Sequence, residues 1–134
     1  PHVSAENWTA ELSRYDAGWL HCASGNNFGD MLLTCWDDFN IPARISTYAA
    51  AGLPVIVPDN SGHISAVSDS LQAVGAGLFY SCYEELNEKL RAEIASREHT
   101  ASMHRNRRKF CFDYYVPQLN DLFHEAIAYN NQQL

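Results

Sequence analysis

The sequence has few basic residues, because nine Lys and Arg stand against sixteen Asp and Glu, and its formal net charge is −7. A protein that binds nucleic acid without sequence preference needs a basic face that neutralises phosphates, so we expect no nucleic-acid partner. The sequence also has no apolar run near the roughly 20 residues that a membrane-spanning helix needs, and no signal segment at its start. We therefore expect a soluble, cytoplasmic protein.

Cysteines are also few. Cys22, Cys35, Cys82 and Cys111 are widely spaced, and they form neither a C-x-x-C pair nor a zinc-ligand pattern with any histidine. We interpret them as reduced thiols and expect no metal and no other cofactor. Internal repeats and low-complexity tracts are absent as well.

The length of the chain, 134 residues, and its 46% hydrophobic composition suit one core of ordinary size, so a single domain over residues 1–134 is expected. The chain begins at Pro1 rather than at methionine. We interpret it as a piece of a longer protein, and we expect the first strand and helix of its domain to be missing.

Strand and helix patterns alternate along the chain. Short, largely apolar runs predict buried strands at residues 17–23, 53–58 and 77–81. Apolar residues at helical spacing, with caps and stops, predict helices at residues 5–15, 42–51, 63–70, 84–97, 102–110 and 116–129, the last within a C-terminal helical segment at 113–134. Residues 31–39 fit either a helical turn or an extended flap. The alternation predicts an α/β fold, a Rossmann-like three-layer domain with a parallel sheet and helices on both faces.

Ligands of such sheets bind beyond the carboxyl ends of the strands, which places the expected site at residues 23–40 and 58–62. His63 follows Gly62 at this rim, where it has either a purely structural role or a contact with a phosphate or sugar. His21, inside the first predicted strand, is interpreted as a hydrogen-bonded core histidine.

The stretch from Asn40 to Val55 resembles a motif of retaining glycosyltransferases that have two facing Rossmann-like domains, P-x-(K or R)-x-x-E-Y-x-A-x-G-x-P-V. The residues that agree are Pro42, Arg44, Tyr48, Ala49 or Ala50, Ala51, Gly52, Pro54 and Val55. Residues 12–20 are similar to the helix-then-strand element that precedes the motif in that family, and residues 77–90 are similar to its next unit. The resemblance covers about the first hundred residues.

The resemblance implies the C-terminal, donor-binding domain of an enzyme of the GT-B fold, glycosyltransferase group 1 type. The full-length protein would transfer a sugar from a nucleotide diphosphate donor to a carbohydrate or lipid acceptor without a metal. Its partners would be the nucleotide-sugar donor and an N-terminal acceptor domain of the same protein, and this piece alone would be inactive. No residue receives a catalytic role; the donor-binding residues would be Asp38, Asn40, Ile41, Arg44, Thr47, Tyr48, Gly62 and His63.

The motif has a physical basis as a diphosphate site. A helix that starts near Pro42 turns its unpaired N–H groups and its positive end toward the strand ends. The three alanines at 49–51 let this helix lie close to the sheet, and Gly52 permits the reversal into the next strand. The same small residues also suit any Rossmann domain, and Arg44 fits either a donor contact or a solvated first turn.

Two positions depart from the family pattern. Thr47 stands where the family has a glutamate that accepts both ribose hydroxyls, and Phe39 stands where many members have an acidic residue against the sugar. Asp38 is one substitute for that acid; the alternative is that Asp37 and Asp38 are solvated loop residues. The family's basic clamp on the diphosphate would precede Pro1. An alternative function is therefore a non-catalytic α/β interaction module derived from a glycosyltransferase.

Four of the nine cations lie together, at Arg105, Arg107, Arg108 and Lys109. A charge run of this kind is usually a solvated helix end. One alternative is contact with a partner domain. Another is contact with an anionic membrane or a glycolipid acceptor, and this contact would place the protein at the inner face of a membrane.

Overall fold

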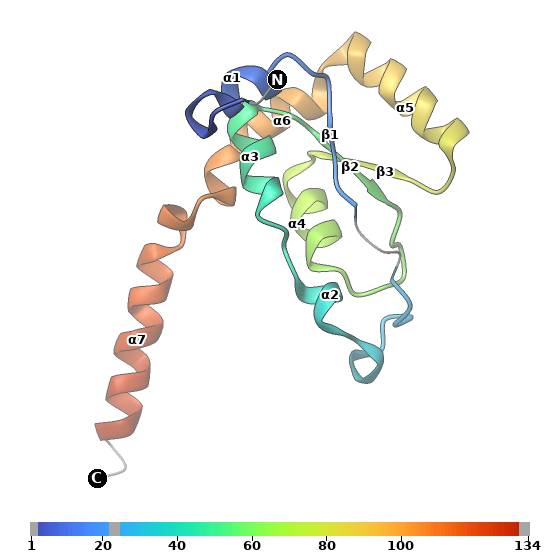
Figure 1. Ribbon diagram of the computed structural model, residues 1–134. Coiled ribbons are helices and arrows are strands. Elements are labelled where there is room, and N and C mark those ends of the chain that lie inside the picture. The colour runs from blue at the N-terminus through green and yellow to red at the C-terminus, as the bar shows by residue number, and fades with distance from the viewer. Residues whose placement is uncertain (1–2, 22–24, 132–134) are drawn as a thin grey trace.

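The computed structural model describes residues 3–21 and 25–131 and shows an α/β protein with an open sheet of parallel strands (Figure 1). The strands lie in the order β1 (Gly18–Trp19), β2 (Val55–Pro58) and β3 (Gly77–Tyr80). In the register of the sheet, Val55 of β2 pairs with Gly18 of β1 on one side and with Gly77 of β3 on the other. The predicted α/β class with a parallel sheet is confirmed, and this architecture is compatible with a Rossmann-like fold.

Helices occupy the segments before, between and after the strands. The α-helices are α1 (Trp8–Leu12), α2 (Trp36–Phe39), α3 (Arg44–Ala51), α4 (Ala66–Val74), α5 (Tyr83–Ser96), α6 (Glu98–Asn106) and α7 (Val116–Asn131). Short 3-10 segments are η1 (Ala5–Asn7), η2 (Met31–Leu33), η3 (Arg107–Phe110) and η4 (Phe112–Tyr114).

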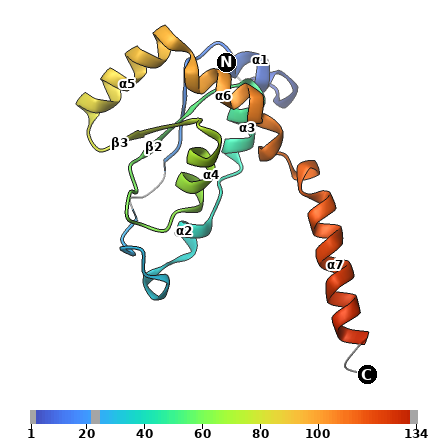
Figure 2. The same cartoon turned by 180° about the vertical axis from the view of Figure 1, so that it is seen from behind.

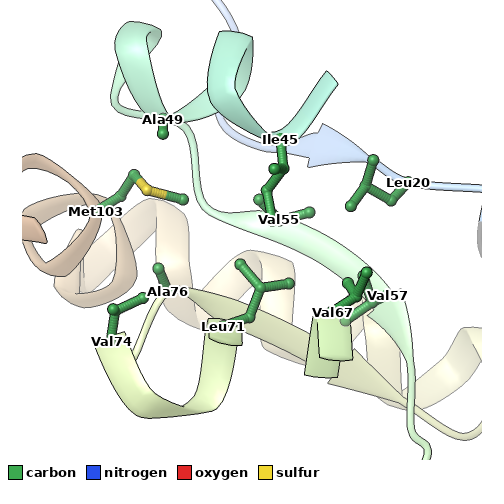
Figure 3. Packing of buried hydrophobic residues seen from close by; sticks show 10 residues of the cluster. All are labelled: Leu20, Ile45, Ala49, Val55, Val57, Val67, Leu71, Val74, Ala76 and Met103. Carbon is green, nitrogen blue, oxygen red and sulfur yellow. The ribbon is translucent and has the colours of Figure 1, made fainter. Parts of the chain in front are cut away.

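The two faces of the sheet carry separate clusters of buried side chains. Val55 and Val57 of β2 pack with residues of α3, α4 and α6, including the fully buried Leu71 and Met103 (Figure 3). Ile56, which points to the opposite face, packs with residues of β3 and α5. Since successive side chains of a strand point to opposite faces, this four-residue strand anchors both halves of the core.

Glycine and serine set the ends of the helices around the sheet. Gly52 ends α3 and Gly75 ends α4, both in the left-handed conformation, with φ of 75° and 64°. Glycine adopts this conformation without steric cost, which explains the tight reversals into β2 and β3. At the start of α4, the Ser65 hydroxyl accepts a hydrogen bond from the Ser68 N–H.

Several predicted boundaries were wrong. The predicted strand 17–23 contains only the two-residue β1, its residues 22 and 23 lie outside the described part of the chain, and His21 is exposed rather than buried. The helix predicted from residue 63 begins at Ala66. The helix predicted from residue 102 begins at Glu98, and residues 31–39 form the short helical segments η2 and α2.

A buried carboxylate explains the early start of α6. Glu93 of α5 is 2% exposed, and it accepts hydrogen bonds from the N–H groups of His99 and Thr100 and from the Thr100 hydroxyl. These are the first N–H groups of α6, which have no partner within the helix. The capping residue therefore lies in the preceding helix, where no local sequence signature reveals it.

The last helix, α7, projects away from the rest of the molecule (Figures 1 and 2). Its predicted apolar side, which includes Leu122, Phe123 and Ile127, is exposed. The segment predicted as helical from residue 113 contains η4 and then α7, and residues 132–134 lie outside the described range. Among the described helices, none is long and apolar enough to cross a membrane.

Candidate functional site

A groove lies where the chain leaves β1 and β2. Its first part is a cavity of about 530 Å³, lined by Gly25 and Asn26 after β1, by Asn60 after β2, and by Asn40 before α3. A second cavity, of about 550 Å³, begins at the same His21 and Pro42 that border the first and follows α3 to Trp8. Because the two cavities share these lining residues, they lie next to each other at the predicted edge of the sheet, and together we call them the groove.

Two asparagines join the loops that follow β1 and β2. The buried Asn27 donates from Nδ2 to the Ile64 carbonyl (2.9 Å), and its Oδ1 accepts from the N–H groups of Ile64 (2.8 Å) and Gly29 (3.1 Å). Asn60, also buried, accepts from the Gly25 N–H at 2.7 Å. Backbone groups of each loop thus form hydrogen bonds with the asparagine side chain of the other loop, and these bonds hold the walls of the first cavity in place.

The imidazole of His63 takes part in the same junction. Its Nδ1 accepts a hydrogen bond from the Phe28 N–H at 3.1 Å, and the two rings lie 5.2 Å apart. In the neutral ring this leaves the proton on Nε2, which donates to no other residue in the described part of the chain. His63 and the left-handed Gly62 (φ 82°) border an adjoining cavity of about 260 Å³.

Asp38 has a local structural partner inside the groove. Its Oδ2 accepts a hydrogen bond from the Cys35 N–H at 2.8 Å, which caps the first turn of α2. That hydrogen bond is the main cause of a pKa of Asp38 below its usual range, and the side chain of Asn27 adds to the effect. Asp38 is therefore a carboxylate, and it lines the first cavity together with Asp37 and Asn40. Ile41 is exposed and is not among the described residues that line the first cavity, the second cavity or those that adjoin them.

Arg44 and Thr47 lie in the second cavity, on the first turns of α3. The first N–H to bond back along this helix is that of Ile45, to the Pro42 carbonyl at 2.9 Å. The preceding N–H groups belong to Ala43 and Arg44, which both line the cavity, so the positive end of α3 and a cationic residue border the same cavity.

Tyr48, by contrast, fastens β1 to α3. Its hydroxyl donates to the Trp19 carbonyl at 3.0 Å, and its ring lies so close to Gly18 that a Cβ at Gly18 would be 2.6 Å from the ring carbons. Tyr48 also borders a side cavity of about 330 Å³ with Trp8 and Glu11. Tyr48, which was expected among the donor-binding residues, thus has its hydroxyl engaged with the backbone of β1.

Charge divides the groove into two parts. Carboxylates and amides line the first cavity, whereas its described lining contains no Lys or Arg. The second cavity has the opposite character, because Arg44 is its one charged lining residue among those described, and Glu11 borders only the side cavity that Arg44 and Thr47 also line. An anionic group therefore suits the second cavity, and hydroxyl donors suit the first.

The sequence-predicted site residues are thus brought together in part. Asp38 and Asn40 share the first cavity and Arg44 and Thr47 the second, while Gly62 and His63 lie in the adjoining one. Sequence reasoning missed Trp8, Glu11 and Asn60, which line these cavities, and Asn27, whose hydrogen bonds join the two loops. An asparagine in each loop after a strand was the available signal for two of them.

Residues that could hold a metal do not come together in the described part of the chain. Cys35, Cys82 and Cys111 are free and exposed, and Cys22 falls outside the described ranges. Comparisons of this chain with known protein families, with curated proteins and with solved structures give no match.

Proposed function

We propose that this chain is the nucleotide-sugar-binding part of a cytoplasmic, metal-independent glycosyltransferase with two Rossmann-like domains, as the motif at residues 40–55 implies. The observation that carries the proposal is the meeting of the α3 N-terminus and Arg44 in one half of a groove whose other half presents carboxylates and amides. A nucleotide sugar has the same division, because an anionic diphosphate joins a nucleoside to a neutral ring of hydroxyl groups.

In this proposal the diphosphate lies at the first turn of α3, beside Arg44. The unpaired N–H groups of that turn and the guanidinium both favour negative charge, and an arginine binds phosphate oxygens in a bidentate way. The nucleoside extends along α3 toward Thr47 and Trp8, where the indole offers a flat apolar surface for the base.

The sugar ring then occupies the first cavity. Asp38 is ionised and Asn40 offers both a donor and an acceptor, so their side chains can bind the hydroxyls of a hexose. His63 borders the adjoining cavity and contributes a donor from Nε2. This chain would position the donor and stabilise its phosphates, and the acceptor domain of the full-length protein, facing a carbohydrate or lipid acceptor, would complete the reaction.

A second candidate is a non-catalytic interaction module with the same ancestry. The observation in its favour is that the described lining of the second cavity contains no carboxylate, because Glu11 borders only the side cavity that it shares with Thr47. A single hydroxyl oxygen can make only part of the bidentate contact that the two oxygens of a carboxylate make with two ribose hydroxyls.

The test is a titration of the chain with UDP, GDP and their glucose and mannose conjugates, followed by amide NMR shifts. Donor binding predicts shifts at residues 38–48 and 60–63, with a dissociation constant in the millimolar range because Arg44 is the one Lys or Arg among the described residues that line the second cavity. Arg44→Ala should weaken binding roughly tenfold, which is the loss of about 1.4 kcal/mol from one charge-assisted contact. The control is Arg91→Ala, which removes the same charge from an exposed position on α5.

Thr47→Glu separates the two candidates. It restores the carboxylate that the family motif has at this position, so tighter nucleotide binding supports the donor site. If neither the wild type nor Thr47→Glu shows shifts at 10 mM ligand, the donor site is refuted and the interaction module is favoured.

A further inference from the structure

The segment from Arg105 to the end of α7 packs Phe110 against the core, but most of its other described side chains are exposed, and their distribution is unusual. Four cations occupy positions 105–109, which leaves five cations against sixteen Asp and Glu in the rest of the chain. Arg107, Arg108 and Lys109 are exposed, and none of them forms an ion pair with a described residue. The only concentrated positive charge of the protein is therefore free to meet an anionic partner.

Exposed aromatic and aliphatic side chains follow directly after these cations. Phe112 of η4 is 71% exposed, and Tyr114 and Tyr115 are also exposed. In α7, the side chains of Leu122, Phe123 and Ile127 are 58%, 54% and 59% exposed. A single soluble domain rarely presents so many large apolar groups on one continuous segment.

The residues of α7 are sorted between two sides. At 100° per residue, Leu119, Leu122, Phe123 and Ile127 fall on one side of the helix, and Asp121, His124 and Glu125 fall on the other. Apart from its junction with η4, the helix lies away from the described body (Figures 1 and 2). A 16-residue helix is marginal in water without tertiary packing, so it needs a surface that covers its apolar side.

We propose that residues 105–129 dock the protein onto a bilayer that carries anionic lipid headgroups. The cations at 105–109 bind the headgroups, the aromatic residues at 112–115 enter the interfacial layer, and the apolar side of α7 lies in the plane of the membrane. This inference goes beyond the donor site and does not depend on it.

Charge complementarity is the reason for choosing an anionic surface over a neutral one or a second copy of the chain. The acidic remainder of the protein is repelled by anionic headgroups, so only the segment at 105–109 can face them, which gives the docked protein one orientation. The acidic side chains Asp121 and Glu125 lie on the side of α7 opposite its apolar residues and so point away from the headgroups. A second copy would bring another net charge of −7 to the interface.

The test is co-sedimentation of the 134-residue chain with vesicles of phosphatidylcholine alone and of phosphatidylcholine with 30% phosphatidylglycerol. We expect binding to the anionic vesicles at 50 mM NaCl and little binding at 500 mM NaCl, where screening shortens the range of electrostatic attraction. Each headgroup-bound cation contributes about fivefold to the partition coefficient. Arg107→Ser/Arg108→Ser should therefore lower it on the order of 25-fold.

The matched control is Arg14→Ser/Arg91→Ser, which gives the same net charge but leaves the segment intact, and its partition coefficient should stay within about twofold of the wild-type value. Phe123→Ser/Ile127→Ser should also abolish binding, while the thermal unfolding of the domain stays unchanged because both side chains are exposed. Equal loss in the two arginine variants, equal binding to both kinds of vesicle, or no binding at low salt would overturn the proposal. So would a dimer in sedimentation equilibrium that Phe123→Ser/Ile127→Ser dissociates, because a second copy would then cover the helix.

Discussion

Replacing Asn27 with alanine should separate the two loops that form the groove. The side chain is fully buried and makes three hydrogen bonds, two with Ile64 and one with Gly29. The substitution leaves two backbone N–H groups and one carbonyl without their partner. At about 1 kcal/mol for each, the expected loss in the free energy of unfolding is about 3 kcal/mol.

Urea denaturation followed by circular dichroism measures this loss. In thermal unfolding, the same loss of about 3 kcal/mol corresponds to a fall in Tm of about 10 °C for a domain of this length. The slope of the free energy against urea should stay unchanged, because the surface exposed on unfolding is nearly the same.

The neighbouring Asn26 offers a matched control. It is exposed, and its side chain forms no hydrogen bond with another residue of the described chain, so Asn26→Ala should change the free energy of unfolding by less than about 0.5 kcal/mol. If the two alanine variants are equally stable, then the asparagine does not hold the loops together, and our account of how the cavity walls are fixed is wrong.

Three other substitutions test other parts of the structure. Tyr48→Phe removes the hydrogen bond to the Trp19 carbonyl, so the free energy of unfolding in urea should fall by about 1 kcal/mol. Nucleotide affinity, measured by calorimetry, should change less than twofold. A larger change in affinity would give the hydroxyl a role in binding. Burial alone would raise the pKa of Glu93, but the hydrogen bonds from Thr100 outweigh this effect, so the pKa is lowered on folding. The ionised carboxylate therefore contributes its full stabilisation of the fold above the unfolded-state pKa of about 4.3. This contribution is lost as the pH falls through the lower pKa of the folded state. Glu93→Gln should then cost about 2 kcal/mol near pH 7 and almost nothing in acid, and a cost independent of pH in denaturation curves would exclude an ionised carboxylate. Leu71→Ala, at a site with no exposed surface, should cost about 3 kcal/mol by the same assay, and a cost below 1 kcal/mol would contradict its place in the core.

Patterns within a few residues were sufficient for part of the fold. The β-branched run before Pro58 predicted β2, and Gly52 marked the end of α3, because both depend on local conformational preference. The start of α4 could not be predicted in the same way. The Ile64 N–H bonds to Asn27, 37 residues earlier, and this contact keeps residues 60–64 in a turn.

For the candidate site, the rule that ligands bind at the carboxyl ends of strands pointed to the two loops that border the first cavity. It could not distinguish Asn26 from Asn27, which are identical in type and adjacent, although one is exposed and the other buried. It also could not reveal that the Tyr48 hydroxyl bonds to the backbone of β1, because that contact depends on how closely Gly18 lets the ring approach. Side-chain roles at the site depend on contacts distant in sequence.

The short length of β1 also determines how the groove can move. Two residue pairs join β1 to β2, whereas four join β2 to β3. Amide hydrogen exchange samples openings of this kind, which release the least stable units of a protein while its core stays folded. The wall of the groove that belongs to β1 is therefore the first to detach, and a ligand bridging both loops would slow exchange there without affecting β3.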